Sequence, residues 1–141
     1  MARRAIEIEG FRHANPIPAA CRVGPLLVSS VVVGRDPVTG EMPDDVAEQL
    51  ANLFDHVGAI LVEAGADWRH VARMSFHVPD LALRDAINVP WLVRFPDPAS
   101  RPARHTQAAE KVTSPRWSNS ATTVSPTSNG IARMNEPDRI T

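Results

Sequence analysis

The stretch that decides the fold is Asp44–Gly65, which reads DDVAEQLANLFDHVGAILVEAG. Its apolar residues recur every three or four positions, which predicts a helix with one buried stripe. Asp44 is a residue type that caps the start of a helix, and Gly65 is the type that ends one. A helix of this kind must bury its stripe against another element. The stripe consists of Val46, Leu50, Leu53, Val57, Ile60 and Leu61.

Segments typical of β-strands lie on both sides of this helix. Leu26–Val33 is β-branched and almost wholly apolar, so we expect a strand that is buried on both faces. Val71–Val78 also predicts a strand, with Arg73, Ser75 and His77 on the face opposite Met74 and Phe76. Shorter strands are expected at Ala5–Glu9, Ala19–Val23 and Ala103–Gln107.

A second helix is predicted over about Leu83–Phe95, and Pro90 should bend or divide it. The resulting order, β-β-β-α-β-α-β, favours an α+β fold with one sheet and two helices on one of its faces. From Glu110 onward Ser, Thr, Asn and Pro dominate. We therefore expect a domain over residues 1–110 and a weakly structured tail over 111–141, with at most one weak strand at Trp117–Val124.

Composition narrows the functional classes. The chain has 141 residues and a net charge of −1, so we expect no nucleic-acid partner. No apolar run approaches the length of a membrane span, and no apolar segment follows the N-terminal charges as in a secretory signal. Cys21 is the single cysteine, and the five histidines lack the spacing of metal ligands. These features predict a cytoplasmic protein without a zinc site.

The candidate binding site is Ser100–Thr106, which reads SRPARHT. An arginine near the start of a short strand presents a planar fork that matches a carboxylate. Arg101 and Arg104 are therefore candidates for binding a small carboxylate, although a surface ion pair with an aspartate is the alternative. His105 could act as an acid or base, but a strand neighbour of Arg104 faces the other side. Ser30 lies in an apolar strand with no identifiable base, which disfavours a nucleophilic role.

Several motifs, in this order, resemble the reactive intermediate deaminase (Rid, or YjgF-like) family. Pro102-Ala103-Arg104 is similar to the family's P-A-R-S/T, and Asp36–Glu41 to its D-P-x-T-G-E turn. Leu27–Ser30 is similar to its V-S-G strand, and Asn88 to the asparagine of its second helix. The remaining matches are Gln49–Leu61, Ala64-Gly65-Ala66 and Val71, which follow the family's Q-x-x-x-x-x-x-N-x-x-x-I-L-x-x-A-G and D-V pattern.

The resemblance implies a chorismate-mutase-like α+β fold and a homotrimer with a cleft between each pair of subunits. It also implies hydrolysis of reactive enamines and imines to keto acids and ammonia, without a cofactor. Arg104 would then bind the substrate carboxylate, and the segment around Ser30 would approach the ligand. Arg101 and His105 remain further candidates for substrate contact.

The chain also departs from the family pattern. It has no tyrosine, and Ser30-Val31 stands where the family has its glycine. Ser114–Ala121 contains no acidic residue, although the family's last strand carries a glutamate that helps to orient water. Two alternatives therefore stay open. One is a non-catalytic, trimeric carboxylate-binding or chaperone-like relative. The other is a deaminase of an aminomuconate-type diacid that uses both Arg101 and Arg104.

Overall fold

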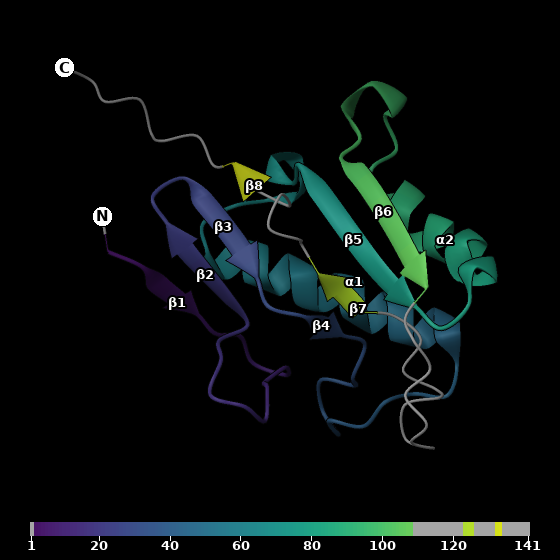
Figure 1. The fold of residues 1–141 in the computed structure, drawn as a ribbon, viewed down its shortest axis with the longest axis horizontal. Coiled ribbons are helices and arrows are strands. Elements are labelled where there is room, and N and C mark those ends of the chain that lie inside the picture. The colour runs from purple at the N-terminus through teal and green to yellow at the C-terminus, as the bar shows by residue number, and fades with distance from the viewer. Residues whose placement is uncertain (1, 109–122, 126–131, 134–141) are drawn as a thin grey trace.

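The computed structural model describes residues 2–108, 123–125 and 132–133, and it has the expected α+β architecture. The strands lie in one layer with α1 (Val46–Glu63) and α2 (Arg84–Arg94) behind it (Figure 1). The strands are β1 (Arg4–Ile6), β2 (Ala20–Val23), β3 (Leu26–Ser29), β4 (Val32–Val33), β5 (Arg73–Val78), β6 (Ala103–Ala108), β7 (Thr123–Ser125) and β8 (Ala132–Arg133). Three short 3₁₀ helices complete the described elements: η1 (Trp68–His70), η2 (Leu81–Leu83) and η3 (Pro98–Ser100).

Hydrogen bonds divide the strand layer into two four-stranded sheets, in the orders β1-β2-β3-β8 and β4-β7-β5-β6. The pairs are antiparallel except for β5 and β6, which run parallel. The short β7 pairs with both β4 and β5, so a segment from the tail completes the second sheet. Two tail strands, β7 and β8, replace the single weak strand expected, and the rest of Trp117–Val124 lies outside the described residues.

The segment Leu26–Val33 is not one strand buried on both faces, as the sequence had suggested. It is divided into β3 and β4, which belong to different sheets. Leu27 and Val32 are buried, whereas Val31 between the two strands is 43% exposed. The two helices lie on one face of the strand layer (Figure 1).

The long helix α1 forms where its periodicity predicts, with a correction at its start. The N-cap is Asp45 and not Asp44, because the Asp45 side chain accepts a hydrogen bond from the backbone N of Glu48 at 3.3 Å. Gly65 follows the helix with φ of +77°, the left-handed conformation expected of a glycine there. Pro90 lies inside α2 but does not divide it.

The core lies between the strand layer and the two helices. An aromatic cluster runs through it: Phe54 stacks on Phe76 and Trp68, and Trp91 meets Phe76 and Phe95 edge to face. The fully buried Leu50, Leu53, Met74 and Ile87 surround this cluster. Each such side chain contributes about 1.5–3 kcal/mol by leaving water, so this core holds β5 firmly against α1 and α2.

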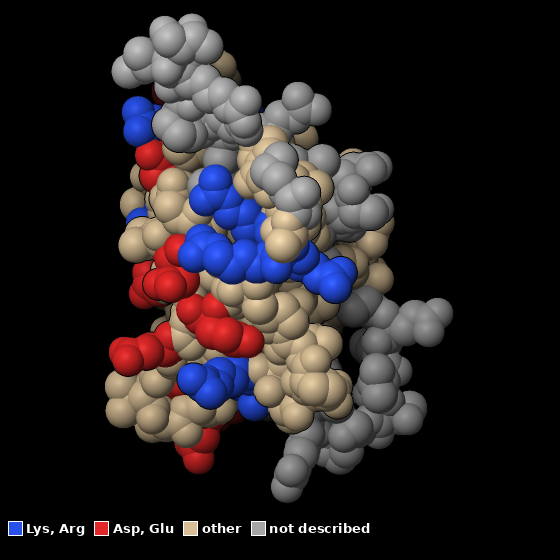
Figure 2. All heavy atoms as spheres, turned by 90° about the vertical axis from the view of Figure 1, so that its left-hand side faces the viewer, with Lys and Arg blue, Asp and Glu red and all other residues tan. Residues whose placement is uncertain are grey.

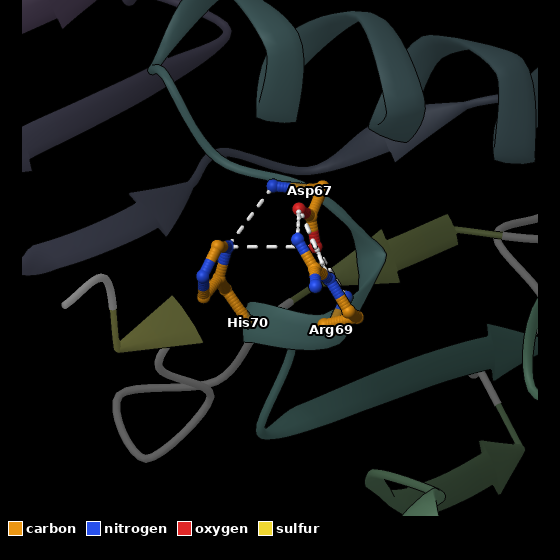
Figure 3. Close-up of polar contacts among 3 residues, drawn as sticks. All are labelled: Asp67, Arg69 and His70. Carbon is orange, nitrogen blue, oxygen red and sulfur yellow. Dashed lines mark hydrogen bonds and ion pairs between the residues drawn. The ribbon is translucent and has the colours of Figure 1, made fainter.

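The turn from α1 into β5 is organised by Asp67, as Figure 3 shows. Its carboxylate accepts the backbone N–H of Arg69 at 2.8 Å and forms an ion pair with the Arg69 guanidinium at 2.7 Å. The backbone N–H of Asp67 donates to Nδ1 of His70 at 3.1 Å, which completes a capping box. The hydrogen bonds that the carboxylate accepts from Arg69, from its side chain first and then from its backbone N–H, lower the pKa of Asp67 to about 2.

Basic side chains gather in a band across the face that β1 and β2 form, with acidic side chains beside them (Figure 2). Arg4 and Arg22 are direct cross-strand partners on these strands. Arg22 donates to the carbonyl oxygen of Ala64 at 2.6 Å, and Arg4 to that of Glu63 at 3.4 Å. Cations favour the negative C-terminal end of a helix, so these two arginines stabilise the end of α1.

Candidate functional site

The parallel pairing of β5 and β6 positions Arg104. Arg104 lies opposite Met74, and the next pair on the same face is Phe76 with Thr106. Because Met74 and Phe76 are buried in the core, the Arg104 side chain lies on the helix-covered side of the sheet. Its guanidinium carbon is 5.0 Å from the ring centre of Trp91 on α2, a cation–π contact.

Within the described residues, the Nη1 atom of the Arg104 guanidinium meets no hydrogen-bond acceptor. That atom is withdrawn from solvent and has no hydrogen-bond partner in the described part of the chain. The ion pairs found there are Arg69–Asp67 and Arg94–Asp55, so the alternative of an Arg104–aspartate pair is not observed among the described residues. Burial, followed by repulsion from Arg84, lowers the pKa of Arg104 below its usual value. An unpaired, desolvated cation is unfavourable, and an anionic ligand would relieve it.

One stripe of α2 faces this arginine. Arg84, Asn88 and Trp91 follow each other at spacings of four and three residues, so they share a side of the helix. Arg84 comes directly after η2, and η2 packs against β6. The structure thus gathers Arg84, Asn88, Trp91 and Arg104 in one region. Sequence reasoning missed Arg84, because no local pattern distinguishes it from a surface arginine.

Arg101 lies just before β6 and is engaged with backbone. Its Nε donates to the carbonyl oxygen of Phe95 at 2.9 Å, and its Nη2 to that of Pro96 at 3.3 Å. These bonds hold the chain that leaves α2 and lead it towards β6. A role for Arg101 in substrate binding stays a prediction.

His105 lies on the other face of β6, next to Ser75 of β5. The His105 ring is within hydrogen-bond distance of the Arg73 guanidinium through its Nδ1. Two polar atoms beside it are buried without a partner in the described residues, Nε of Arg73 and Oγ of Ser75. Within one chain, the side chains of His105 and Arg104 therefore lie on opposite faces of the sheet. The contact of His105 with substrate stays a prediction. Neither Arg73 nor Ser75 was singled out from the sequence.

Ser30 lies at the break between β3 and β4. Its backbone N donates to the carbonyl oxygen of Ala19 at 2.9 Å, and its own carbonyl accepts the Ser29 hydroxyl at 2.8 Å. Ser30 lines an open hollow of about 460 Å³ that Cys21 and Arg3 also border. Arg104 does not line this hollow. The two residues that the resemblance assigns to one ligand thus line separate regions of the single chain.

The described residues contain no cluster of three or more histidine, cysteine or acidic side chains arranged to hold a metal ion. Nor does that part of the chain include a helix both long and apolar enough to cross a membrane.

A family model described as Endoribonuclease L-PSP matches residues 9–118. The chain belongs to this Rid/YjgF-like family. A RutC family protein of Pyrococcus abyssi is 31% identical over 106 residues, which cover 74% of this chain and 82% of the relative. Reactive Intermediate Deaminase A of Arabidopsis thaliana, a chloroplastic protein, is 32% identical over 93 residues, 65% of this chain and 49% of the relative.

Solved Rid/YjgF-like structures share the fold. The YjgF gene product of E. coli superposes with a TM-score of 0.77 at 22% identity and covers 94% of this chain and 99% of its own. The Rid protein YyfA of Yersinia pestis gives a TM-score of 0.79 at 18% identity, covering 94% of this chain and all of its own. The family and the fold class expected from the sequence are therefore confirmed.

Proposed function

We propose that this Rid/YjgF-like chain hydrolyses reactive 2-imino and 2-enamino acids to 2-keto acids and ammonia. The observation that carries the proposal is the guanidinium of Arg104, whose Nη1 is buried over Trp91 without an acceptor in the described residues. The deaminase name of the Arabidopsis thaliana relative, at 32% identity, supports the same chemistry.

In this reaction Arg104 holds the substrate carboxylate, and the paired N–H groups of its fork fix the orientation of the imine carbon. An enamine first takes up a proton from solvent at its β-carbon, loses one from its nitrogen and becomes the imine. The oxygen of water then bonds to the imine carbon, and one proton of that water passes to the nitrogen. The carbon–nitrogen bond breaks as the proton of the new hydroxyl passes to the nitrogen, so ammonia leaves and the keto acid remains. The protein needs to position the reactants and stabilise charge, and neither task requires a metal or another cofactor.

We further propose that the active site forms between the subunits of a homotrimer. β6 is the last strand of its sheet, so its outer backbone groups are available to a neighbouring chain. Ser30 and its hollow lie on another part of the chain, and a second copy could bring them to Arg104. Sedimentation should show a species about three times the 15.4 kDa chain; a stable monomer at micromolar concentration would remove the shared cleft.

The decisive experiment measures ammonia released from freshly generated 2-aminoacrylate. Arg104→Ala should lower kcat/KM by roughly 30- to 1000-fold, because it removes a charge-assisted bidentate contact. Arg104→Lys should fail nearly as badly, since a point charge cannot replace a planar fork. Arg101→Ala should lose far less, because the Arg101 guanidinium is bonded to backbone carbonyls. Circular dichroism checks that each variant folds.

Two outcomes would overturn the proposal. Full activity in a folded, trimeric Arg104→Ala variant would place the site elsewhere. A wild-type protein that binds pyruvate but never releases ammonia would favour a non-catalytic carboxylate-binding relative. The missing acid in Ser114–Ala121 is the feature of the sequence that favours this second reading.

A further inference from the structure

We propose that the Arg104 site selects a substrate with two carboxylates, and that Arg84 binds the second one. This inference rests on the proposed function and adds the class of substrate: a dicarboxylic 2-imino acid. Arg104 takes the carboxylate next to the imine carbon. Arg84, at the first position of α2, takes the carboxylate at the far end of the molecule.

The first argument is the placement of the two cations. Arg84, Asn88 and Trp91 share one side of α2, and the Arg104 guanidinium lies 5.0 Å from the centre of the Trp91 ring. The 3₁₀ helix η2, which ends where Arg84 begins, packs against the strand that carries Arg104. Both positive charges therefore border the same region, and they are close enough that Arg84 is a cause of the lowered Arg104 pKa.

The second argument is that nothing in the described residues neutralises this pair. Neither Arg84 nor Arg104 takes part in the ion pairs found there. The Nε of Arg84 is directed to the Leu81 carbonyl oxygen at 3.2 Å, which leaves its terminal nitrogens available. The nearby Asp80 carboxylate accepts the backbone N–H of Ala82 at 2.9 Å and serves as the cap of η2.

Two unneutralised cations beside each other repel, and a single carboxylate would relieve only part of that repulsion. A dianion would relieve it fully and gain two charge-assisted contacts. The structure therefore assigns the second cation to Arg84, whereas the sequence had suggested Arg101. The Arg101 guanidinium is bonded to the Phe95 and Pro96 carbonyls instead.

The test compares stable keto acids by isothermal titration calorimetry on the intact protein. Oxaloacetate should bind about tenfold more tightly than pyruvate, and added salt should reduce this preference. Arg84→Ala should abolish the preference while leaving pyruvate binding within about twofold. Arg84→Lys should retain most of it, because a distal carboxylate at an exposed position needs charge more than a planar fork.

Arg94→Ala is the matched control. It removes the same charge from the same helix, but Arg94 pairs with Asp55 at 3.1 Å and lies over Trp68. Its keto-acid preference should equal that of the wild type. The same comparison is then made in turnover, with imines generated from aspartate or from alanine by an amino-acid oxidase and catalase.

The outcomes separate the two proposals. Equal binding of pyruvate and oxaloacetate, with ammonia still released from 2-aminoacrylate, overturns the dicarboxylate inference and leaves the deaminase standing. A preference for oxaloacetate that survives Arg84→Ala overturns the role of Arg84. Binding of neither keto acid, together with no turnover of any imine, removes the proposed function and this inference with it.

Discussion

The Nη1 atom of Arg22 lies 2.6 Å from the carbonyl oxygen of Ala64, so a cation from β2 closes the C-terminal end of α1. The same guanidinium donates through Nε to the carbonyl oxygen of Gly24 at 2.8 Å. One half-buried side chain thus links the first sheet, its β2–β3 turn and the longest helix. This link accounts for the position of the Arg22 side chain.

Replacing Arg22 by methionine should lower the free energy of unfolding by about 2 kcal/mol, because a charged donor to two partly buried carbonyls is lost while the apolar stem remains. Urea denaturation measures the change. Arg4→Met is the control, since its contact with Glu63 is longer, at 3.4 Å, and exposed. Equal losses in the two variants would show that the Arg22 contact adds nothing beyond surface charge.

Gly34→Ala should destabilise the protein by about 3 kcal/mol or more, the range of severe steric mutations. A Cβ at this position would lie 1.9 Å from the carbonyl oxygen of Gln49, a backbone atom of α1 that has no room to move. Gly58→Ala is the contrasting change, because its Cβ would meet only the Trp68 ring at 3.4 Å. We expect that variant to gain about 0.5–1 kcal/mol from helix propensity. Thermal unfolding should show a lower midpoint for Gly34→Ala and a higher midpoint for Gly58→Ala than for the wild type.

The contacts of the Asp67 carboxylate with Arg69 should make a contribution to stability that depends on pH. The pKa of Asp67 is lowered from 3.8 to about 2, so its ionised form is favoured in the folded state. The contribution is therefore complete above about pH 4 and is lost as the pH falls towards 2. Asp67→Asn removes it, so the stability difference between wild type and variant should shrink across that window. Denaturation midpoints at successive pH values measure this difference, and a constant difference would contradict the assignment.

Ser75→Ala should leave stability unchanged or raise it by up to about 1 kcal/mol, because the hydroxyl is buried without a partner in the described residues. Ser29→Ala is the matched control. The Ser29 hydroxyl donates to the Ser30 carbonyl at 2.8 Å, so its removal should cost about 0.5–1 kcal/mol. A marked loss of stability in Ser75→Ala would show that this hydroxyl has a hydrogen-bond partner beyond the described residues and contradict the prediction.

Where the structure departs from the sequence-based expectations, the cause lies in contacts between distant segments. The helix stripe predicted from apolar spacing omits Gln49 and His56, which are nevertheless buried. The Nε2 atom of His56 is hydrogen-bonded to the carbonyl oxygen of Arg35 at 2.7 Å, and the side-chain amide of Gln49 donates to the carbonyl oxygen of Pro43. Both satisfy the backbone of the segment that leads into α1. Periodicity alone cannot reveal such partners, because they depend on where that segment lies.

By itself, the sequence determined the α+β class, the two helices, the left-handed Gly65 and Arg104 as the candidate ligand residue. The first three follow from local chemistry, namely apolar periodicity and the conformational freedom of glycine. Arg104 follows from the planar fork of an arginine near the start of a strand, together with the resemblance of Pro102-Ala103-Arg104 to the family's motif. Only the tertiary structure decided that β3 and β4 enter different sheets and that β7 completes the second sheet. It also placed Arg84 close enough to Arg104 to lower the pKa of that arginine, and it bonded the Arg101 guanidinium to the carbonyl oxygen of Phe95. Strand partners and the surroundings of a charge are set by long-range packing, which no local pattern encodes.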